Sequence, residues 1–125
     1  MRAYLFISLY FAILCMAGSP DVVDDLAKLG RQLRHLRSLP GGAPTSASCP
    51  KNLSRFTGLQ KKQIADALGA PDYTEGGSKT DKPLEWSYFF TSPVPEGQLG
   101  GGFPELTFIF GRHGRVMQTT CYYSR

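Results

Sequence analysis

Residues 106–116 read LTFIFGRHGRV, an alternating apolar run followed directly by a turn rich in glycine. Alternation of this kind, with aromatic and β-branched residues, is typical of a strand. If residues 112–114 form a three-residue loop with a left-handed Gly114, Phe110 lies opposite Val116 on the returning strand. That register predicts an apolar set on one face of the hairpin, made of Leu106, Phe108, Phe110 and Val116. Such a face requires helices to cover it.

A further strand is predicted at Glu85–Thr91, where Trp86 alternates with other aromatic residues. We expect Trp86 and Tyr88 to face the helices and Phe89 to face away from them, because side chains of a strand alternate between its two faces. Trp86 is therefore interpreted as a core residue.

Two short helices are predicted in front of these strands. The first is a single turn near Phe56. In the second, Ile64 and Leu68 lie four residues apart and form one apolar stripe, and Gly69 ends the helix in a left-handed conformation. The predicted fold class is α+β, with two short helices packed on a three-stranded antiparallel sheet and preceded by an amphipathic helix.

The amphipathic helix is predicted in residues 18–39. Its apolar residues recur at alternating spacings of four and three, at Val22, Leu26, Leu29, Leu33 and Leu36. Acidic residues occupy its first turn and basic residues its last turn, which complements the helix dipole. The apolar seam either folds back on the domain or contacts a partner helix or a second copy, so Leu29 and Leu33 are candidate partner-contacting residues. Residues 40–48 form a linker that allows the helix to fold back.

Residues 1–17 are predicted to be a signal peptide. The apolar run that follows Arg2 has the length of a secretory signal and is short for a membrane-spanning helix. Cleavage near Ala17 is favoured, because small residues then occupy the two positions that signal cleavage requires. Two alternatives stay open, an uncleaved anchor and lipidation at Cys15. Leu14 disfavours lipidation, because a lipoprotein signal needs a small residue there.

Cys49 and Cys121 are the two cysteines that remain after such a cleavage. A lone cysteine pair in a small exported domain predicts a disulfide. In the chain-entropy model, the long loop that it closes corresponds to about 4 kcal/mol of stabilisation. The hairpin register places Cys121 on the face opposite to Val116, unless a β-bulge intervenes.

These elements, in this order and spacing, resemble the BamE/OmlA (SmpA) domain family of Gram-negative envelope proteins. The matching elements are Gly58-Leu59, Gln63-Ile64, Ala67-Leu68-Gly69-Ala70-Pro71, Trp86-Ser87-Tyr88, Leu106-Thr107-Phe108-Ile109-Phe110 and Gly114-Arg115-Val116. The resemblance covers the domain at residues 49–125. It departs from the family pattern at Gln60, a poor helix cap where family members usually carry Thr.

The resemblance implies a non-catalytic accessory protein of the periplasm, associated with the outer membrane, that assists outer-membrane protein assembly or envelope integrity. The implied partners are envelope proteins, including the outer-membrane assembly machinery. Removal of Arg2 with the signal peptide lowers the net charge from +4 to +3. This mild charge, spread over interspersed acids and bases, predicts weak attraction to anionic lipid headgroups and no nucleic-acid binding. An alternative function is a secreted or periplasmic inhibitor or binding module, because the helix-on-sheet unit is also similar to β-lactamase-inhibitor domains, which present an open sheet to their target.

The face of the sheet away from the two short helices is the predicted contact surface. Its candidate partner-contacting residues are Phe89, Ile109, Met117 and Tyr123. That much apolar surface on a small domain is expected to be covered. Either the helix of residues 18–39 covers it within the same chain, which we favour, or another protein covers it.

No enzymatic activity, cofactor or metal site is predicted. His113 lies at the tip of a turn, where a solvated imidazole is expected, and His35 lies at the basic end of a helix with no nucleophile nearby in the sequence. The two cysteines lack a second pair of ligands for zinc. The glycines of residues 97–102 lack the order that phosphate-binding loops require.

Overall fold

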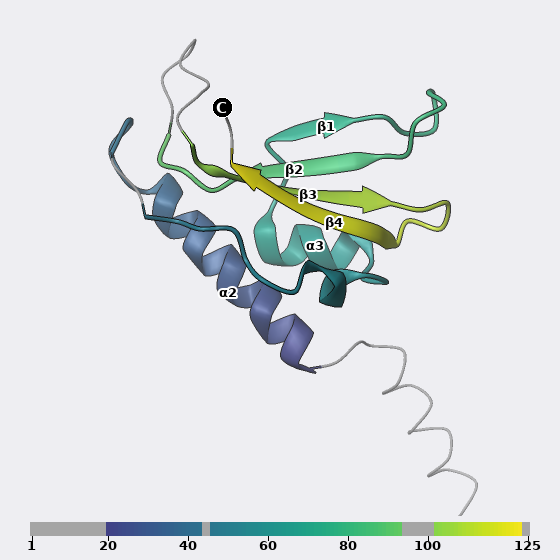
Figure 1. Ribbon diagram of the computed structural model, residues 1–125, viewed down its shortest axis with the longest axis horizontal. Helices are drawn as coiled ribbons and strands as arrows, with labels where there is room; N and C mark the ends of the chain where they lie inside the picture. Colours follow the sequence, from purple (N-terminus) through teal and green to yellow (C-terminus); the bar gives the residue numbers. More distant parts are fainter. Residues whose placement is uncertain (1–19, 44–45, 94–101, 124–125) are drawn as a thin grey trace, which may run out of the picture.

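The computed structural model describes residues 20–43, 46–93 and 102–123. In chain order these form α2 (Pro20–Arg37), the single 3₁₀ turn η1 (Leu53–Phe56), α3 (Lys61–Leu68), β1 (Tyr73–Glu75), β2 (Glu85–Phe89), β3 (Pro104–Phe110) and β4 (Val116–Tyr123) (Figure 1). The fold class is α+β, as predicted. The predicted signal peptide, with Cys15 and the cleavage position at Ala17, lies outside the described residues.

The sheet has four antiparallel strands in the order β1-β2-β3-β4, not the predicted three. The unpredicted strand is β1, which pairs Tyr73 with Ser87 and Glu75 with Glu85. All its side chains are exposed, so it has no apolar face of its own and the sequence around it resembles a polar loop. Its position is set by backbone pairing with β2, which the amide of Asp72 extends by donating to the carbonyl oxygen of Ser87 at 2.9 Å.

The β3–β4 hairpin has the predicted register. Phe110 lies opposite Val116, and the amide of Gly111 donates to the carbonyl oxygen of Arg115 at 2.8 Å. Gly114 has a φ of +71°, the left-handed conformation that glycine adopts most readily. The predicted apolar set is buried, namely Leu106, Phe108, Phe110 and Val116.

A β-bulge follows this hairpin immediately. Phe110 pairs with Val116, whereas Ile109 pairs with Gln118, so Met117 has no partner in β3. An extra residue reverses the facing of every later side chain in its strand, because side chains alternate with a period of two. In the remainder of β4, each side chain therefore points to the face opposite to the one it would have in an uninterrupted ladder.

The bulge directs Cys121 toward the helices. Cys121 lies opposite the buried Leu106 and forms the predicted disulfide with Cys49, 72 residues earlier. Tyr123 turns the same way, and its hydroxyl oxygen accepts a hydrogen bond from the amide of Cys49 at 3.1 Å. The disulfide and this hydrogen bond thus connect the segment before η1 to the end of β4.

The two predicted short helices are one 3₁₀ turn, η1, and one α-helix, α3. Both pack on the apolar face of the sheet, η1 through Phe56 and α3 through Ile64 and Leu68. The ring of Phe56 meets Phe108 edge-on, with 6.1 Å between centroids. Trp86 packs against the same core and meets Phe110 edge-on at 5.0 Å.

Contacts around Gln60 compensate for the poor cap that it was expected to provide. The amide of Gln60 donates to Oε1 of Gln63 at 2.9 Å, one half of a capping box. The amide of Lys61 donates to the carbonyl oxygen of Gly114 in the β3–β4 turn at 3.2 Å. The start of α3 is therefore tied both to its own first turn and to the hairpin.

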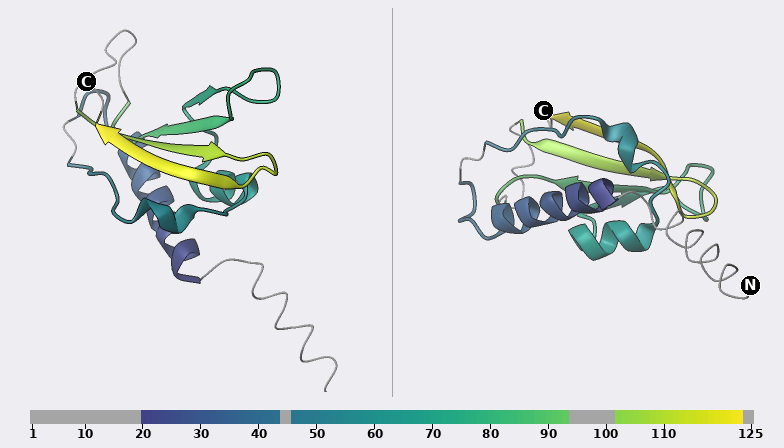
Figure 2. Two further views of the ribbon diagram at one scale, coloured as in Figure 1. Left: turned by 45° about the vertical axis from the view of Figure 1, so that its right-hand side comes forward. Right: turned by 90° about the horizontal axis from the view of Figure 1, so that it is seen from below.

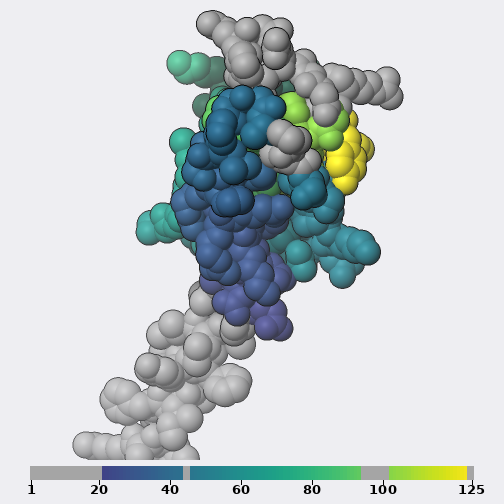
Figure 3. All heavy atoms as spheres, turned by 90° about the vertical axis from the view of Figure 1, so that its left-hand side faces the viewer, coloured from purple at the N-terminus to yellow at the C-terminus, as the bar shows by residue number. Residues whose placement is uncertain are grey.

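Helix α2 belongs to the same core as η1 and α3. It lies beside α3 on one side of the sheet (Figure 2). Val22 of its seam is partly buried, and the other four residues are buried, namely Leu26, Leu29, Leu33 and Leu36. The expectation that this helix would cover the opposite face of the sheet is therefore wrong. In the space-filling view, α2 runs as a continuous blue to purple band along one side of the molecule (Figure 3).

The side that α2 takes is explained by its contact with α3. Gly30 of α2 lies against the backbone of Ala67, where a side chain would overlap the carbonyl oxygen. One turn later, Nη1 of Arg34 donates to that same oxygen at 3.3 Å. Since carbonyl groups in the last turn of a helix lack a partner within the helix, this bond favours α2 beside the end of α3.

Candidate functional site

The side of the sheet away from α2 and α3 carries no helix of the described residues (Figure 1). We call this side the outer face. The strand register directs these residues toward it: Tyr73, Glu75, Glu85, Ser87, Phe89, Glu105, Thr107, Ile109, Gln118, Thr120 and Tyr122. The bulged Met117 lies at its margin, beside Gly111 at the end of β3.

Large side chains are exposed on the outer face. Tyr73 is 52% exposed, Met117 55% and Tyr122 70%. Phe89 and Ile109 are half-buried. Several large, partly apolar side chains gathered on one face of a small domain are typical of a contact surface.

Small hydroxyl residues occupy the middle of the outer face. Ser87 is buried, and its hydroxyl is hydrogen-bonded to that of Thr107 across the two central strands at 2.8 Å. These short side chains satisfy each other and leave the larger Tyr73 and Tyr122 to project from the outer strands. The middle of the face therefore carries short side chains, and its two outer strands carry the tyrosine rings.

The outer face is acidic, although the chain has a net charge of +4. Glu75, Glu85 and Glu105 point outward, and no Lys, Arg or His occurs in any of the four strands. Glu75 and Glu85 are direct cross-strand partners. Like charges placed directly opposite each other destabilise a sheet, so this pair costs the free protein stability.

The structure places most of the predicted contact residues together but not all of them. Phe89 and Ile109 lie on the outer face and Met117 at its margin. The prediction for Tyr123 is wrong, because the bulge turns it to the helix side of the sheet. Tyr122 takes its place on the outer face.

Leu29 and Leu33 do not contribute to any contact surface. They are 8% and 1% exposed and belong to the core between α2, α3 and the sheet. Their prediction as partner-contacting residues is therefore wrong. The apolar seam of α2 is used within the chain.

A second surface feature is an open cleft of about 890 Å³ at the end of the sheet where the two hairpins turn. Its apolar lining includes Leu84, Phe110 and Met117. Four cations border it, Lys61, Lys79, Lys82 and Arg112, with Asp81 as a single acidic neighbour. None of these cations forms an ion pair within the described part of the chain. We call this region the basic cleft.

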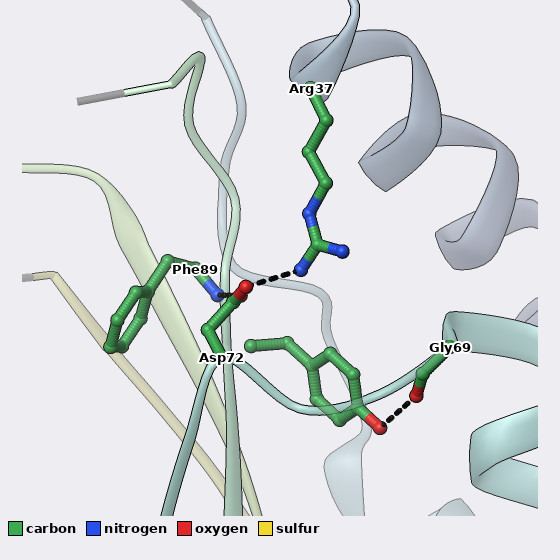
Figure 4. Close-up of polar contacts among 5 residues, drawn as sticks. Arg37, Gly69, Asp72 and Phe89 are labelled. Carbon is green, nitrogen blue, oxygen red and sulfur yellow. Dashed lines mark hydrogen bonds and ion pairs between the residues drawn. The ribbon is translucent and has the colours of Figure 1, made fainter. Parts of the chain in front are cut away.

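Asp72 holds α2, β1 and β2 together (Figure 4). Its Oδ1 accepts a hydrogen bond from Nη2 of Arg37 at 2.6 Å, and its Oδ2 accepts one from the amide of Phe89 at 2.8 Å. Both oxygens of the carboxylate are thus engaged by structural partners. This carboxylate therefore has a structural role, because it bonds α2 to β2, and it is not free to act as a general base.

Tyr88 lies beside this group and fastens α3 to the sheet. Its hydroxyl donates to the carbonyl oxygen of Gly69, just after α3, at 2.8 Å (Figure 4). Burial raises the pKa of Tyr88 well above its ordinary 10.0, the Asp72 carboxylate raises it further, and Arg37 opposes the shift. The phenol therefore stays protonated and remains a donor.

Residues 20–43, 46–93 and 102–123 contain no group of three or more His, Cys, Asp or Glu side chains that could hold a metal ion. His35, on α2, and His113, in the β3–β4 turn, are exposed. In the same described ranges, neither helix combines the length and the apolar composition that crossing a bilayer demands.

Comparisons of this chain with protein-family models, with curated proteins and with solved structures found no match. The resemblance to the BamE/OmlA family therefore rests on the sequence elements described above.

Proposed function

We propose that this protein is a non-catalytic binding domain of the bacterial envelope and that it acts on another protein through the outer face. The observation that carries the proposal is the one-sided packing of the fold. In the described residues every helix packs on one side of the sheet, and the other side keeps Tyr73 and Tyr122 more than half exposed, with the exposed Met117 at its margin. Tyrosine and methionine are enriched in protein interfaces, which supports this use of the face.

The proposed location is the periplasm, in association with the outer membrane, after signal cleavage near Ala17. The disulfide between Cys49 and Cys121 supports an oxidising compartment, because disulfides persist there and are rare in the cytosol. The resemblance to the BamE/OmlA family supports envelope proteins, including the outer-membrane assembly machinery, as partners. The weak contact with anionic lipid headgroups is proposed for the basic cleft, since its four cations lack ion pairs.

An inhibitor or binding module with an enzyme as its target is the second candidate. The helix-free outer face favours it as well, because such a module presents an open sheet to its target. The two candidates use the same surface and differ in the partner. An envelope accessory protein requires an assembly protein as its partner, whereas an inhibitor module requires an enzyme whose activity it inhibits.

Genetic rescue tests the proposal in the organism that encodes the protein. The gene is deleted, and sensitivity to bile salts and to large hydrophobic antibiotics is measured with the abundance of outer-membrane proteins. We expect the deletion to raise sensitivity, the native chain to restore it, and the variant Y73S/Y122S to fail although it is exported and folded. The matched control K28S/R31S, on the exposed side of α2, should rescue fully.

Two results would contradict the proposal. Full rescue by Y73S/Y122S would show that the outer face is dispensable. An unaffected envelope combined with a raised periplasmic hydrolase activity in the deletion strain would favour the inhibitor instead.

A further inference from the structure

We infer that the outer face takes a basic partner, a protein segment whose Lys or Arg side chains lie between Glu75 and Glu85 and against the ring of Tyr73. The inference rests on the proposed function, because it names the chemistry of the partner at the same surface. It commits to a protein different from this chain.

The opposed pair of glutamates favours a basic partner. Glu75 and Glu85 stand directly opposite each other on β1 and β2, and with Glu105 they form no ion pair in the described residues. Since the strands hold no cation, nothing on the face itself offsets the repulsion. A partner cation between the two carboxylates would relieve this repulsion on binding. The relief would add to the favourable free energy of binding.

The aromatic ring beside this pair offers a cation a further contact. Tyr73 lies two residues before Glu75 on the same face of β1, and its cross-strand partner Ser87 is small. The ring is 52% exposed, so a cation can approach its face. An Arg or Lys side chain near Glu75 can therefore combine a carboxylate contact with a cation–π contact.

The charge of the outer face disfavours a second copy of the chain as the occupant. A symmetric pairing of two outer faces would bring three glutamates from each copy into one interface, with no strand cation on either copy to neutralise them. Like-charge juxtaposition across an interface opposes association. A basic surface on another protein meets no such barrier.

The test uses the exported, oxidised protein, labelled with ¹⁵N, and two synthetic peptides as probes. One peptide alternates arginine with valine, and the other alternates glutamate with valine. We expect the arginine peptide to shift the amide resonances of β1 and β2, to leave those of α2 unchanged, and to bind more weakly as salt is added. The glutamate peptide should produce no shifts at these strands. The net positive charge of the chain disfavours unspecific binding of the arginine peptide, so a localised response is informative.

Variants separate binding from folding. E75Q/E85Q should lower the affinity for the arginine peptide by about three- to tenfold, because two carboxylate contacts are lost. The same variant should raise Tm, because the like-charge repulsion is removed. E75K should raise Tm through a cross-strand ion pair with Glu85, and it should no longer bind the arginine peptide. The control D66N removes an exposed carboxylate from α3, where Asp66 pairs with Lys62, and should leave peptide binding unchanged.

The inference is overturned if the arginine peptide does not bind, if its shifts fall on α2 or α3, or if E75Q/E85Q binds it as well as D66N does. The proposed function fails separately, through rescue by Y73S/Y122S. If that variant still fails to rescue while the arginine peptide does not bind, the outer face is functional and its partner is not basic.

Discussion

Gly30 in α2 lies so close to Ala67 in α3 that any side chain at position 30 would overlap the Ala67 carbonyl oxygen. This contact sets the distance between the two helices. It explains how a helix with a narrow leucine seam joins the core of the following domain.

Replacing Gly30 by alanine tests this contact. The added methyl group meets a backbone oxygen that cannot rotate away, and overpacking of this kind costs about 1–3 kcal/mol. Alanine favours the helix by about 1 kcal/mol, so we expect a net loss of up to about 2 kcal/mol in the free energy of unfolding, measured by urea denaturation. G111A is the matched control, because a methyl group there meets its nearest atom at an ordinary 3.7 Å. Equal stability of both variants would contradict the packing.

The disulfide predicts both a redox state and a stability. Protein isolated from the periplasm should resist alkylation at Cys49 and Cys121 until it is reduced, as mass spectrometry can show. The double variant C49S/C121S should lose about 2–5 kcal/mol in the free energy of unfolding. Two alkylated cysteines in the untreated protein would refute both the bond and the oxidising compartment.

Tyr88 predicts a dependence of stability on alkaline pH. Its folded-state pKa lies above the ordinary 10.0, so its contribution is complete below about pH 10 and is lost as pH rises toward the folded-state pKa. Y88F should lose about 0.5–1.5 kcal/mol at neutral pH with the hydrogen bond to Gly69. Its stability should then fall less steeply than that of the native chain above about pH 10. Parallel alkaline curves for the two proteins would contradict this role.

Thr119 carries a hydroxyl that the bulge has turned toward the core. Its Oγ1 is buried without a hydrogen-bond partner, and a buried unpaired polar group costs about 1–3 kcal/mol. T119V should therefore raise the free energy of unfolding by about 1 kcal/mol. The control T107V removes a hydroxyl that is bonded to Ser87 and should lower it. Destabilisation by T119V would indicate that Thr119 has a partner such as a buried water.

The β3–β4 hairpin was predictable because local chemistry fixes it. A strand of alternating aromatic residues leads into a turn whose Gly114 must be left-handed, and this fixes Phe110 opposite Val116. The stop of α3 at Gly69 depends likewise on a local signal. The Cys49–Cys121 disulfide was predictable for another reason, since these are the two cysteines that follow the predicted signal peptide.

The strand β1 and the bulge were not predictable in the same way. β1 has three exposed residues and is held by its pairing with β2, which leaves no apolar period in its own sequence. The bulge at Met117 exchanges Tyr123 for Tyr122 on the outer face. No residue in that run demands a bulge by its own backbone preference, although the disulfide requires Cys121 to face Cys49 and thereby indicates one.

The candidate surface was predictable only on the strands that the sequence itself indicates. Phe89 and Ile109 follow from alternation along β2 and β3. Glu75 and Tyr73 were missed with β1, and with them the opposed glutamates. The side taken by α2 depends on the contact of Gly30 with Ala67, and a glycine within a helical pattern does not identify its neighbour.

Photo-crosslinking in living cells tests the use of the outer face most directly. A photoreactive amino acid is placed at Tyr122 on the outer face, and in a second strain at Lys28 on the exposed side of α2. We predict that position 122 gives a discrete crosslinked band with one envelope protein and that position 28 does not. Addition of E75K to the position-122 strain should remove the band. No crosslink at position 122, or the same bands from both positions, would contradict the account.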